Sequence, residues 1–395
     1  MPWKESSVMD ERMKFVARYL EGETMAALCR EFGIARKTGY KIVERYHESG
    51  VIGLTDRTRR PVRYGNQLPI KVEKALLQIK ADKPSWGAPK IRERFIRKYP
   101  DLRPPAKSTI HALLDRHGLV VPRGRKRNRA QGTSLSDGKN PNDLWCADFK
   151  GEFQLGNGSY CYPLTITDHS SRYLLSCEGL ESTKEWSAFL VFERVFKEFG
   201  LPLAIRTDNG GPFASANSLF GLSKLSVWWL RLGIGIERIR PGNPQENGRH
   251  ERMHLTLKKE TTKPSEMNLL QQQARFDNFV TEFNSERPHE ALRMKYPCEL
   301  YTKSNRIYEG LPAIEYPLHD RMVLVTSCGR ICIKKLKINL SQVFAGQAVG
   351  IKEVNDGIWL VTFMDYDLGY FDEESKRFEP LDNPFGAKVL PMSPV

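Results

Sequence analysis

The sequence lacks the cysteine spacing and the apolar segments that several protein classes require. Its seven cysteines include no C-x-x-C pair, which favours reduced thiols over a disulfide framework or a zinc site. No window approaches the roughly 18 consecutive apolar residues that a membrane span needs, and no apolar signal core follows Met1. These absences predict a cytoplasmic protein with no membrane partner.

Charge is plentiful and mostly of one sign. The chain carries 61 Lys and Arg against 47 Asp and Glu, a formal net charge of +14. Such a basic balance points to a polyanionic partner, with nucleic acid as the first candidate. At 395 residues the chain is also too long for one ordinary core, and we expect two to four domains.

Apolar residues between Asp10 and Tyr46 recur at helical spacing and predict three short helices. A tight turn at Phe32-Gly33-Ile34 separates a helix that begins near Thr24 from one that begins near Ala35. Two short helices joined in this way are typical of a helix-turn-helix DNA-binding domain, which we place at residues 1–60. The exposed side of its second helix would contact DNA through Arg36, Lys37, Thr38 and Lys41.

Two basic linkers flank a second helical region. Residues 61–69 continue a run rich in arginine and proline, and residues 70–122 repeat the helical pattern, which predicts a second helix-turn-helix-like domain. Residues 123–142 form the second linker, which we expect to neutralise DNA phosphates. Its basic residues are Arg123, Arg125, Lys126, Arg127 and Arg129.

The periodicity changes at Leu144, where alternating and buried patterns replace helical ones. Strands are predicted over 144–153, 160–167, 173–178 and 203–206, with a helix over 185–199, which together outline an α/β layer. From residue 323 onward short strands with hairpin turns predict a small β-barrel, placed at 315–385.

Three acidic residues fall where these elements could bring them together: Asp148 in the first strand, Asp208 after a later strand, and Glu251 in a helix. Carboxylates suit hard cations such as Mg²⁺ or Mn²⁺. A pair of such ions can stabilise the attacking and the leaving oxygen of a phosphoryl displacement. Spacing alone does not single out this triple, because the chain has many other acids.

Three segments that contain these acids carry a family resemblance. The stretches 144–149 (LWCADF), 206–213 (RTDNGGPF) and 241–252 (PGNPQENGRHER) resemble the three signatures of the integrase catalytic core, in that order. The stretch 284–292 (NSERPHEAL) and the tandem helical domains extend the likeness. The sequence therefore resembles bacterial insertion-sequence transposases of the DDE retroviral-integrase superfamily.

The resemblance implies a ribonuclease-H-like catalytic core, at residues 143–305, in which Asp148, Asp208 and Glu251 hold two Mg²⁺ or Mn²⁺ ions per active site. Glu246 is a competing acid, but the pattern Pro-Gln-x-Asn-Gly-x-x-Glu aligns Glu251 with the last ligand. On one continuous helix Glu246 would also point well away from Glu251. Lys258, two turns after Glu251 on the same face, is a candidate phosphate contact, with a solvated surface lysine as the alternative.

The sequence departs from retroviral integrases in two respects. The interval between Asp208 and Glu251 is longer, and we expect its excess, around residues 215–225, to form an extra loop or turn. The zinc-binding His/Cys domain of those integrases has no counterpart here.

The function implied is that of a DNA transposase that binds the terminal inverted repeats of an insertion sequence and catalyses metal-dependent 3′-end cleavage and strand transfer. Its partners would be double-stranded DNA, at the element ends and at the target, and further copies of itself in a homo-oligomer on DNA. In a bacterium it would associate with the nucleoid. Two alternatives stay open: a non-catalytic, sequence-specific DNA-binding regulator, and a ribonuclease-H-like nuclease without joining activity.

Overall fold

The computed structural model describes residues 7–56, 68–120, 135–333 and 336–386. The chain divides into two compact units, residues 1–69 and 70–395. Among the described residues, no helix is both long and apolar enough to cross a membrane. The predicted phosphate contacts Arg123, Arg125, Lys126, Arg127 and Arg129 lie outside the described residues.

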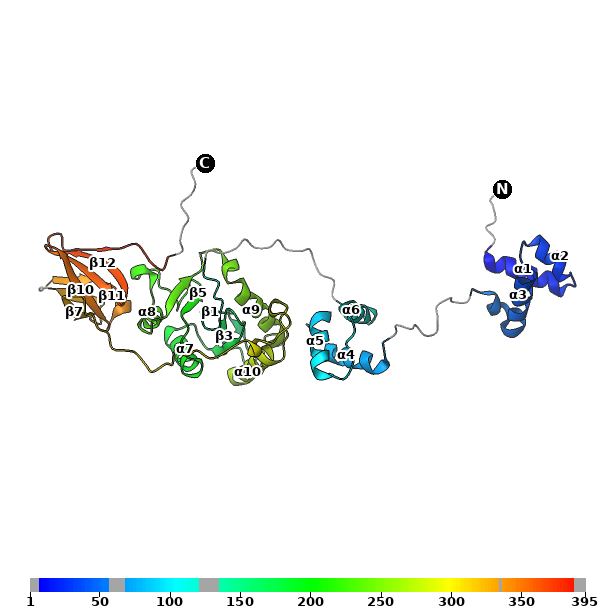
Figure 1. Ribbon diagram of the computed structural model, residues 1–395, viewed down its shortest axis with the longest axis horizontal. Helices are drawn as coiled ribbons and strands as arrows, with labels where there is room; N and C mark the ends of the chain where they lie inside the picture. Colours follow the sequence, from blue (N-terminus) through cyan, green and yellow to red (C-terminus); the bar gives the residue numbers. More distant parts are fainter. Residues whose placement is uncertain (1–6, 57–67, 121–134, 334–335, 387–395) are drawn as a thin grey trace, which may run out of the picture. The chain divides into compact units, whose positions relative to one another are not determined.

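The first unit is a three-helix domain closed by a short 3₁₀ turn (Figure 1). Its elements are α1 (Val8–Leu20), α2 (Met25–Glu31), α3 (Arg36–Ser49) and η1 (Gly50–Leu54). Gly39 of α3 packs so tightly on α2 that an added Cβ would lie 2.7 Å from the sulfur atoms of Met25 and Cys29. This contact fixes α3 against α2 and leaves the opposite face of α3 to solvent.

The second unit begins with another three-helix group, formed by α4 (Ile70–Asp82), α5 (Ala88–Lys98) and α6 (Lys107–Arg116). Ion pairs connect this group to the helices that follow later in the chain. Lys83 lies 2.5 Å from Glu282, and Arg94 lies 2.9 Å from Glu286. Within the predicted helical region at 70–122, the described residues form these three helices, the last of which ends at Arg116.

A mixed sheet forms the centre of the second unit, in the order β2–β3–β1–β5–β6. A further strand, β4, also pairs with β3. β3 runs antiparallel to β1 and β4, whereas β5 runs parallel to β1 and β6. The strands are β1 (Leu144–Phe149), β2 (Phe153–Gln154), β3 (Tyr160–Asp168), β4 (Leu174–Leu180), β5 (Ala204–Thr207) and β6 (Gly235–Arg238). The predicted strand over 144–153 is thus two strands, because Gly151 turns the chain with φ +86°.

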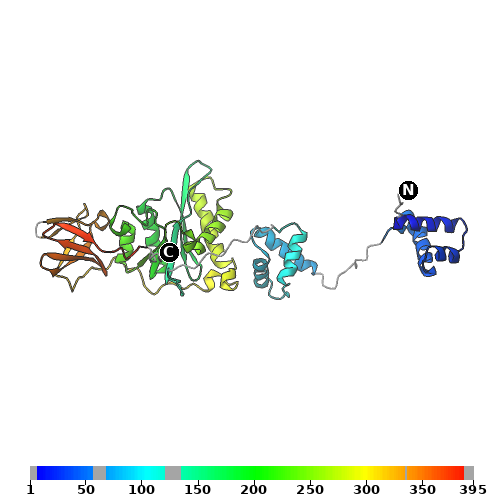
Figure 2. The ribbon, with the colours of Figure 1, turned by 90° about the horizontal axis from the view of Figure 1, so that it is seen from above.

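Helices cover both faces of this sheet (Figures 1 and 2). One face packs on α7 (Glu185–Phe199) and α8 (Lys224–Arg231), through a core that includes Trp145 and Trp229. The other face packs on α9 (Gly248–Thr261) and α10 (Leu269–Ser285), through a core that includes Phe276. Short 3₁₀ turns join these elements: η2 (Leu219–Gly221), η3 (Pro244–Asn247), η4 (Glu290–Leu292) and η5 (Pro297–Glu299).

The C-terminal part is a five-stranded antiparallel sheet in the order β13–β12–β11–β10–β7, with a separate β8–β9 hairpin. Its elements are β7 (Arg321–Leu324), β8 (Arg330–Ile333), β9 (Leu336–Asn339), η6 (Gln342–Phe344), β10 (Ala348–Asn355), β11 (Ile358–Phe363), β12 (Tyr366–Asp372) and β13 (Arg377–Pro380). Among the described strands, β7 and β13 do not pair, so the predicted closed barrel is not confirmed. Instead, the hairpin and α8 supply Ile331, Ile338 and Val227 to the core of this sheet.

Candidate active site

The three candidate acids come from the elements that the sequence indicated. Asp148 lies in β1, Asp208 directly follows β5, and Glu251 lies in the first turn of α9. Because β1 and β5 are parallel neighbours, Asp148 and Asp208 lie toward the same end of the sheet. The Asp208 carboxylate accepts a hydrogen bond from the backbone N–H of Gly210 at 3.1 Å, which holds its side chain at the end of the strand.

The electrostatics of Asp148 show that the three acids influence one another. Burial, the charge of Asp208 and, more weakly, that of Glu251 together raise the pKa of Asp148 to about 7, against the opposing effects of the Phe149 backbone N–H and Lys150. A cation bound among these carboxylates would relieve this repulsion, so the donor chemistry fits Mg²⁺ or Mn²⁺. Within the described ranges, however, no three His, Cys, Asp or Glu side chains are placed to hold one metal ion together.

Two histidines of α9 hold this helix against the sheet. His250 Nε2 and His254 Nε2 lie 2.8 Å and 2.6 Å from the Thr165 hydroxyl of β3, which also donates to the backbone carbonyl of Asp148 at 3.1 Å. His254 Nδ1 lies 3.7 Å from the Asp148 carboxylate. These contacts fix α9, and therefore Glu251, relative to β1.

Both histidines are neutral in this environment. Burial lowers the pKa of His250 to about 3. Burial and the neighbouring His250 and Lys150 lower the pKa of His254 to about 2. Sequence reasoning missed this network, although histidines four residues apart on the helix of Glu251 were a signal that could have revealed it.

Lys150 is a second residue that sequence reasoning missed. Its pKa is lowered by burial and by the charge of Lys258, while Asp148 acts in the opposite direction. The charges of Lys258 and Asp148 therefore both act on Lys150. Because Lys258 is exposed, its side chain can reach a bound anion.

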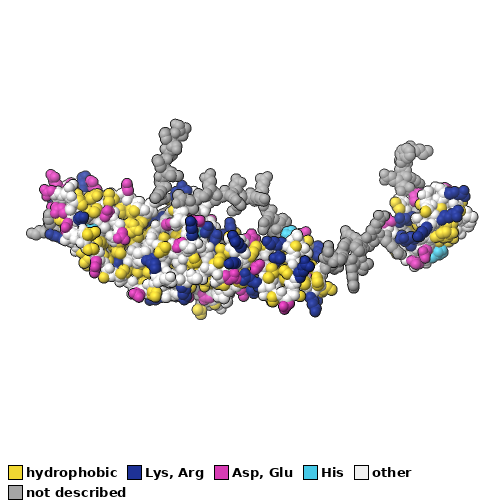
Figure 3. Space-filling model, in the orientation of Figure 1, with side chains coloured by type: hydrophobic (Ala, Val, Ile, Leu, Met, Phe, Trp, Pro, Cys, Tyr) yellow, Lys and Arg dark blue, Asp and Glu magenta, His cyan; other side chains and the backbone are white. Residues whose placement is uncertain are grey.

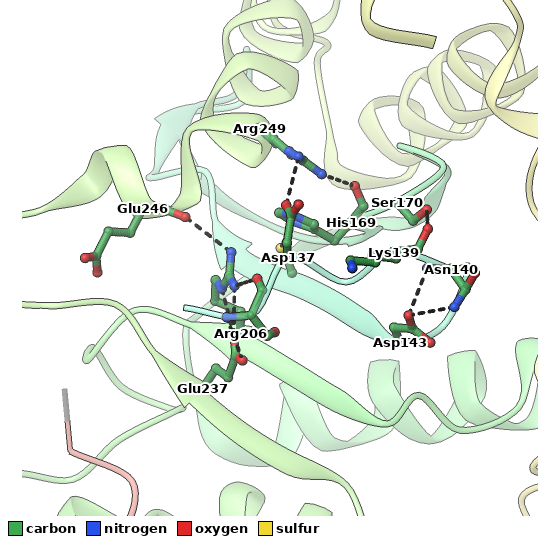
Figure 4. Close-up of polar contacts among 12 residues, drawn as sticks. Asp137, Lys139, Asn140, Asp143, His169, Ser170, Arg206, Glu237, Glu246 and Arg249 are labelled. Carbon is green, nitrogen blue, oxygen red and sulfur yellow. Dashed lines mark hydrogen bonds and ion pairs between the residues drawn. The ribbon is translucent and has the colours of Figure 1, made fainter. Parts of the chain in front are cut away.

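Glu246 is committed to other partners. Its buried carboxylate accepts hydrogen bonds from the backbone N–H of Arg240 at 2.8 Å and from the Arg240 guanidinium at 2.7 Å. Its backbone carbonyl accepts from Arg206, which also pairs with Glu237 at 2.8 Å (Figure 4). Because Glu246 lies in η3 and α9 begins at Gly248, the expected rotation along one continuous helix does not describe its position.

The predicted base-contacting residues lie on α3 of the first unit. Arg36, Lys37, Thr38 and Lys41 are all exposed. At 100° per residue, Lys37 and Lys41 point about 160° around the α3 axis from the packing contact at Gly39, Thr38 about 100° and Arg36 about 60°. Lys37 and Lys41 therefore lie opposite that contact.

Four family models match parts of the chain. Residues 138–244 and 232–297 each match a model described as an integrase core domain. Residues 11–61 match a helix-turn-helix domain, and residues 38–114 match a homeodomain-like domain. These matches cover the first unit, the second helical group and the central sheet with its helices.

Similar proteins come from insertion elements and from retroviruses. The chain is 26% identical over 197 residues to an uncharacterized 31.7 kDa protein of insertion element IS407 from Burkholderia multivorans, covering 49% of this chain and 68% of that protein. It is 28% identical over 223 residues to the Gag-Pol polyprotein of baboon endogenous virus, covering 56% of this chain but only 12% of the polyprotein.

Solved structures show a more distant likeness. The catalytic core domain of the HTLV-2 integrase, in complex with magnesium, is 17% identical with a TM-score of 0.33, covering 42% of this chain and 99% of that domain. A simian T-cell lymphotropic virus intasome in complex with a PP2A regulatory subunit is 14% identical with a TM-score of 0.37, covering 74% of this chain and 97% of the matched chain.

Proposed function

Because this chain belongs to the DDE transposase and integrase superfamily, we propose that it binds the terminal inverted repeats of an insertion sequence, cleaves the 3′ ends and joins them to target DNA. The observation that carries the proposal is the placement of Asp148 and Asp208 toward one end of two parallel neighbouring strands, with Glu251 in the first turn of α9. Such a centre suits phosphoryl transfer on a polyanionic substrate.

We assign metal binding to Asp148, Asp208 and Glu251. When bound, two Mg²⁺ or Mn²⁺ ions would stabilise the charge on the attacking and leaving oxygens of the phosphodiester. Glu251 lies exposed at the start of α9, so its side chain can turn toward the two aspartates. Lys150 and Lys258 would hold the phosphate of the reacting strand, and His250 and His254 would position α9.

The remaining regions divide the recognition of DNA. We propose that the helix-turn-helix domain at 1–60 and the second helical domain at 70–122 bind the terminal repeats, and that the linkers at 61–69 and 123–142 contact phosphates. The catalytic core would span 143–305 and the C-terminal sheet domain 315–385. Assembly of several copies on DNA would bring two element ends to one target.

A strand-transfer assay with the full chain tests the proposal. The purified protein is incubated with Mg²⁺, a duplex that ends in the terminal repeat, and a supercoiled plasmid as target. Covalent joining of the duplex to the plasmid supports a transposase. Cleavage without joining would instead indicate a nuclease, and binding without either reaction would indicate a regulator.

A further inference from the structure

A basic cavity lies beside α9, which contributes Arg249, Arg252, Met253 and Thr256 to its wall. Its basic side chains come from four separate elements or loops, and we call it the arginine pocket. They are Lys90, Arg172, Arg249, Arg252 and Arg287, with His169 and His289. The cavity holds about 140 Å³, which is room for several water molecules at roughly 10–15 Å³ each.

Positive charge in the arginine pocket exceeds the negative charge that could balance it. Arg249 pairs with Asp137 at 3.2 Å, and Arg287 pairs with Glu260 at 2.9 Å. Among the described residues, no carboxylate forms an ion pair with Lys90, Arg172 or Arg252. The carboxylate of Asp168 lines the same cavity, but it is already held by backbone N–H groups of Asn142 and Ser171 and by the Ser171 hydroxyl.

Two nitrogen atoms in this wall are buried without a hydrogen-bond partner in the protein, Nε of Arg172 and Nε2 of His289. Burial and the nearby charges of Arg249 and Arg252 lower the pKa of Arg172 to about 10. Burial and, next, the charge of Arg287 lower the pKa of Lys90 to about 8, against the opposing charges of Glu290 and Glu260. Crowded, partly buried cations of this kind are costly for the protein alone, and a bound anion would offset the cost.

The arginine pocket continues to the surface. Arg172, Arg249 and Arg252 also line a neighbouring cavity that reaches Ser136 and Gly248. Arg249 stands at this junction, where it bonds both Asp137 and the backbone carbonyl of His169 (Figure 4). Lys and Arg side chains gather on the surface of the core near α9 (Figure 3). A long polyanion can therefore reach the pocket along a basic surface.

Helix geometry separates this pocket from the reacting strand. At 100° per residue, Arg249 points about 160° around the α9 axis from Glu251, Thr256, which also lines the pocket, about 140°, and Arg252 about 100°. The pocket thus opens on a different face of α9 from Glu251. We propose that the arginine pocket binds a backbone phosphate of a DNA segment other than the one that reacts beside Asp148. The inference rests on the proposed function, because it takes DNA as the substrate.

The test measures DNA affinity against salt for the full chain and for Arg252→Gln, Arg172→Gln and Arg172→Lys. Arg377→Gln, at an exposed position of β13, is the matched control. Removal of one phosphate-binding charge flattens the slope of log K against log salt by about 0.9. When salt rises from about 50 to 200 mM, the fold-decrease in the binding constant of the variant should therefore be roughly 3.5 times smaller than that of the parent chain. We expect this for Arg252→Gln and Arg172→Gln, whereas Arg172→Lys keeps the charge and the slope.

Arg252 is exposed, so its substitution leaves the fold intact even if Arg172→Gln destabilises the core. Slopes for Arg252→Gln and Arg172→Gln equal to that of Arg377→Gln, in a chain that still cleaves DNA with Mg²⁺, would overturn the inference. Failure of the parent chain itself to cleave or join DNA would instead refute the proposed function, so the two failures are distinguishable.

Discussion

The Glu246 carboxylate accepts two hydrogen bonds from Arg240, one from its backbone N–H at 2.8 Å and one from its guanidinium at 2.7 Å. This pairing occupies the acid that lies nearest to Glu251 in the third motif. We expect Glu246→Gln to keep metal-dependent cleavage, because the amide oxygen can still accept from the Arg240 backbone. Its cost should be about 1.5–3 kcal/mol in the free energy of unfolding, the scale of one hydrogen bond to a charged group. Urea denaturation measures this cost, and a loss of cleavage as complete as that of Glu251→Gln would contradict the assignment.

Thr165 links α9 to β1, because its hydroxyl contacts His250, His254 and the carbonyl of Asp148. Thr165→Val removes the hydroxyl and leaves buried imidazole nitrogen atoms unsatisfied. We expect a loss of about 1–3 kcal/mol of stability and slower cleavage at saturating DNA, with terminal-repeat affinity unchanged. Thr165→Ser should restore the rate. If Thr165→Ser were as slow as Thr165→Val, the hydroxyl would not be what positions the helix.

The raised pKa of Asp148 predicts a pH-dependent stability in EDTA. Its folded-state pKa is about 7, against an ordinary value of 3.8. The folded state therefore binds the proton more tightly than the unfolded state, and stability falls as pH rises from about 4 to about 7. Unfolding by urea at about pH 5 and pH 8 should show that Asp148→Asn removes much of this fall. The exposed control Asp101→Asn should keep it, and identical pH profiles for both variants would contradict the claim.

Helix α3 and the second basic linker should contribute differently to DNA binding. Neutralising Arg36, Lys37 and Lys41 should reduce the preference for the terminal repeat over a scrambled duplex, by ~1–3 kcal/mol for each side chain that reads a base edge. Neutralising Arg123, Arg125, Lys126, Arg127 and Arg129 should weaken binding to both duplexes alike and flatten the salt dependence. Titrations at several salt concentrations distinguish the two. A linker variant without this preference but with an unchanged salt slope would reverse the roles.

The elements near the acidic triad were predictable from the sequence because their patterns are simple. The helix at 185–199 buries one defined face, and the strand that begins at Leu144 starts with a short run of buried residues. Helix α8 was missed, and its region was expected to begin with a loop. Its segment is apolar nearly all round, because Trp229 packs on the central core while Val227 and Leu230 pack on the core of the C-terminal sheet. An apolar run of only eight residues cannot be distinguished from a buried strand by its periodicity alone.

The site was predictable only in part, for a related reason. Motif order indicated Asp148, Asp208 and Glu251, whereas Lys150 and Thr165 carry no signal until β1, β3 and α9 are packed together. The arginine pocket likewise draws Arg172, Arg252 and Arg287 from distant segments. Their convergence depends on tertiary structure, which no local pattern in the sequence contains.

The most direct measurement is cleavage of a terminal-repeat duplex by the parent chain and by Asp148→Asn, Asp208→Asn and Glu251→Gln. The assay is run in Mg²⁺, in Mn²⁺, in Ca²⁺ and in EDTA, with terminal-repeat binding measured in parallel. We predict that the parent chain cleaves only in Mg²⁺ or Mn²⁺, since Ca²⁺ coordinates too loosely for in-line displacement. Each variant should bind the repeat and cleave nothing. Cleavage by the parent chain in EDTA, or by any of the three variants in Mg²⁺, would contradict the account.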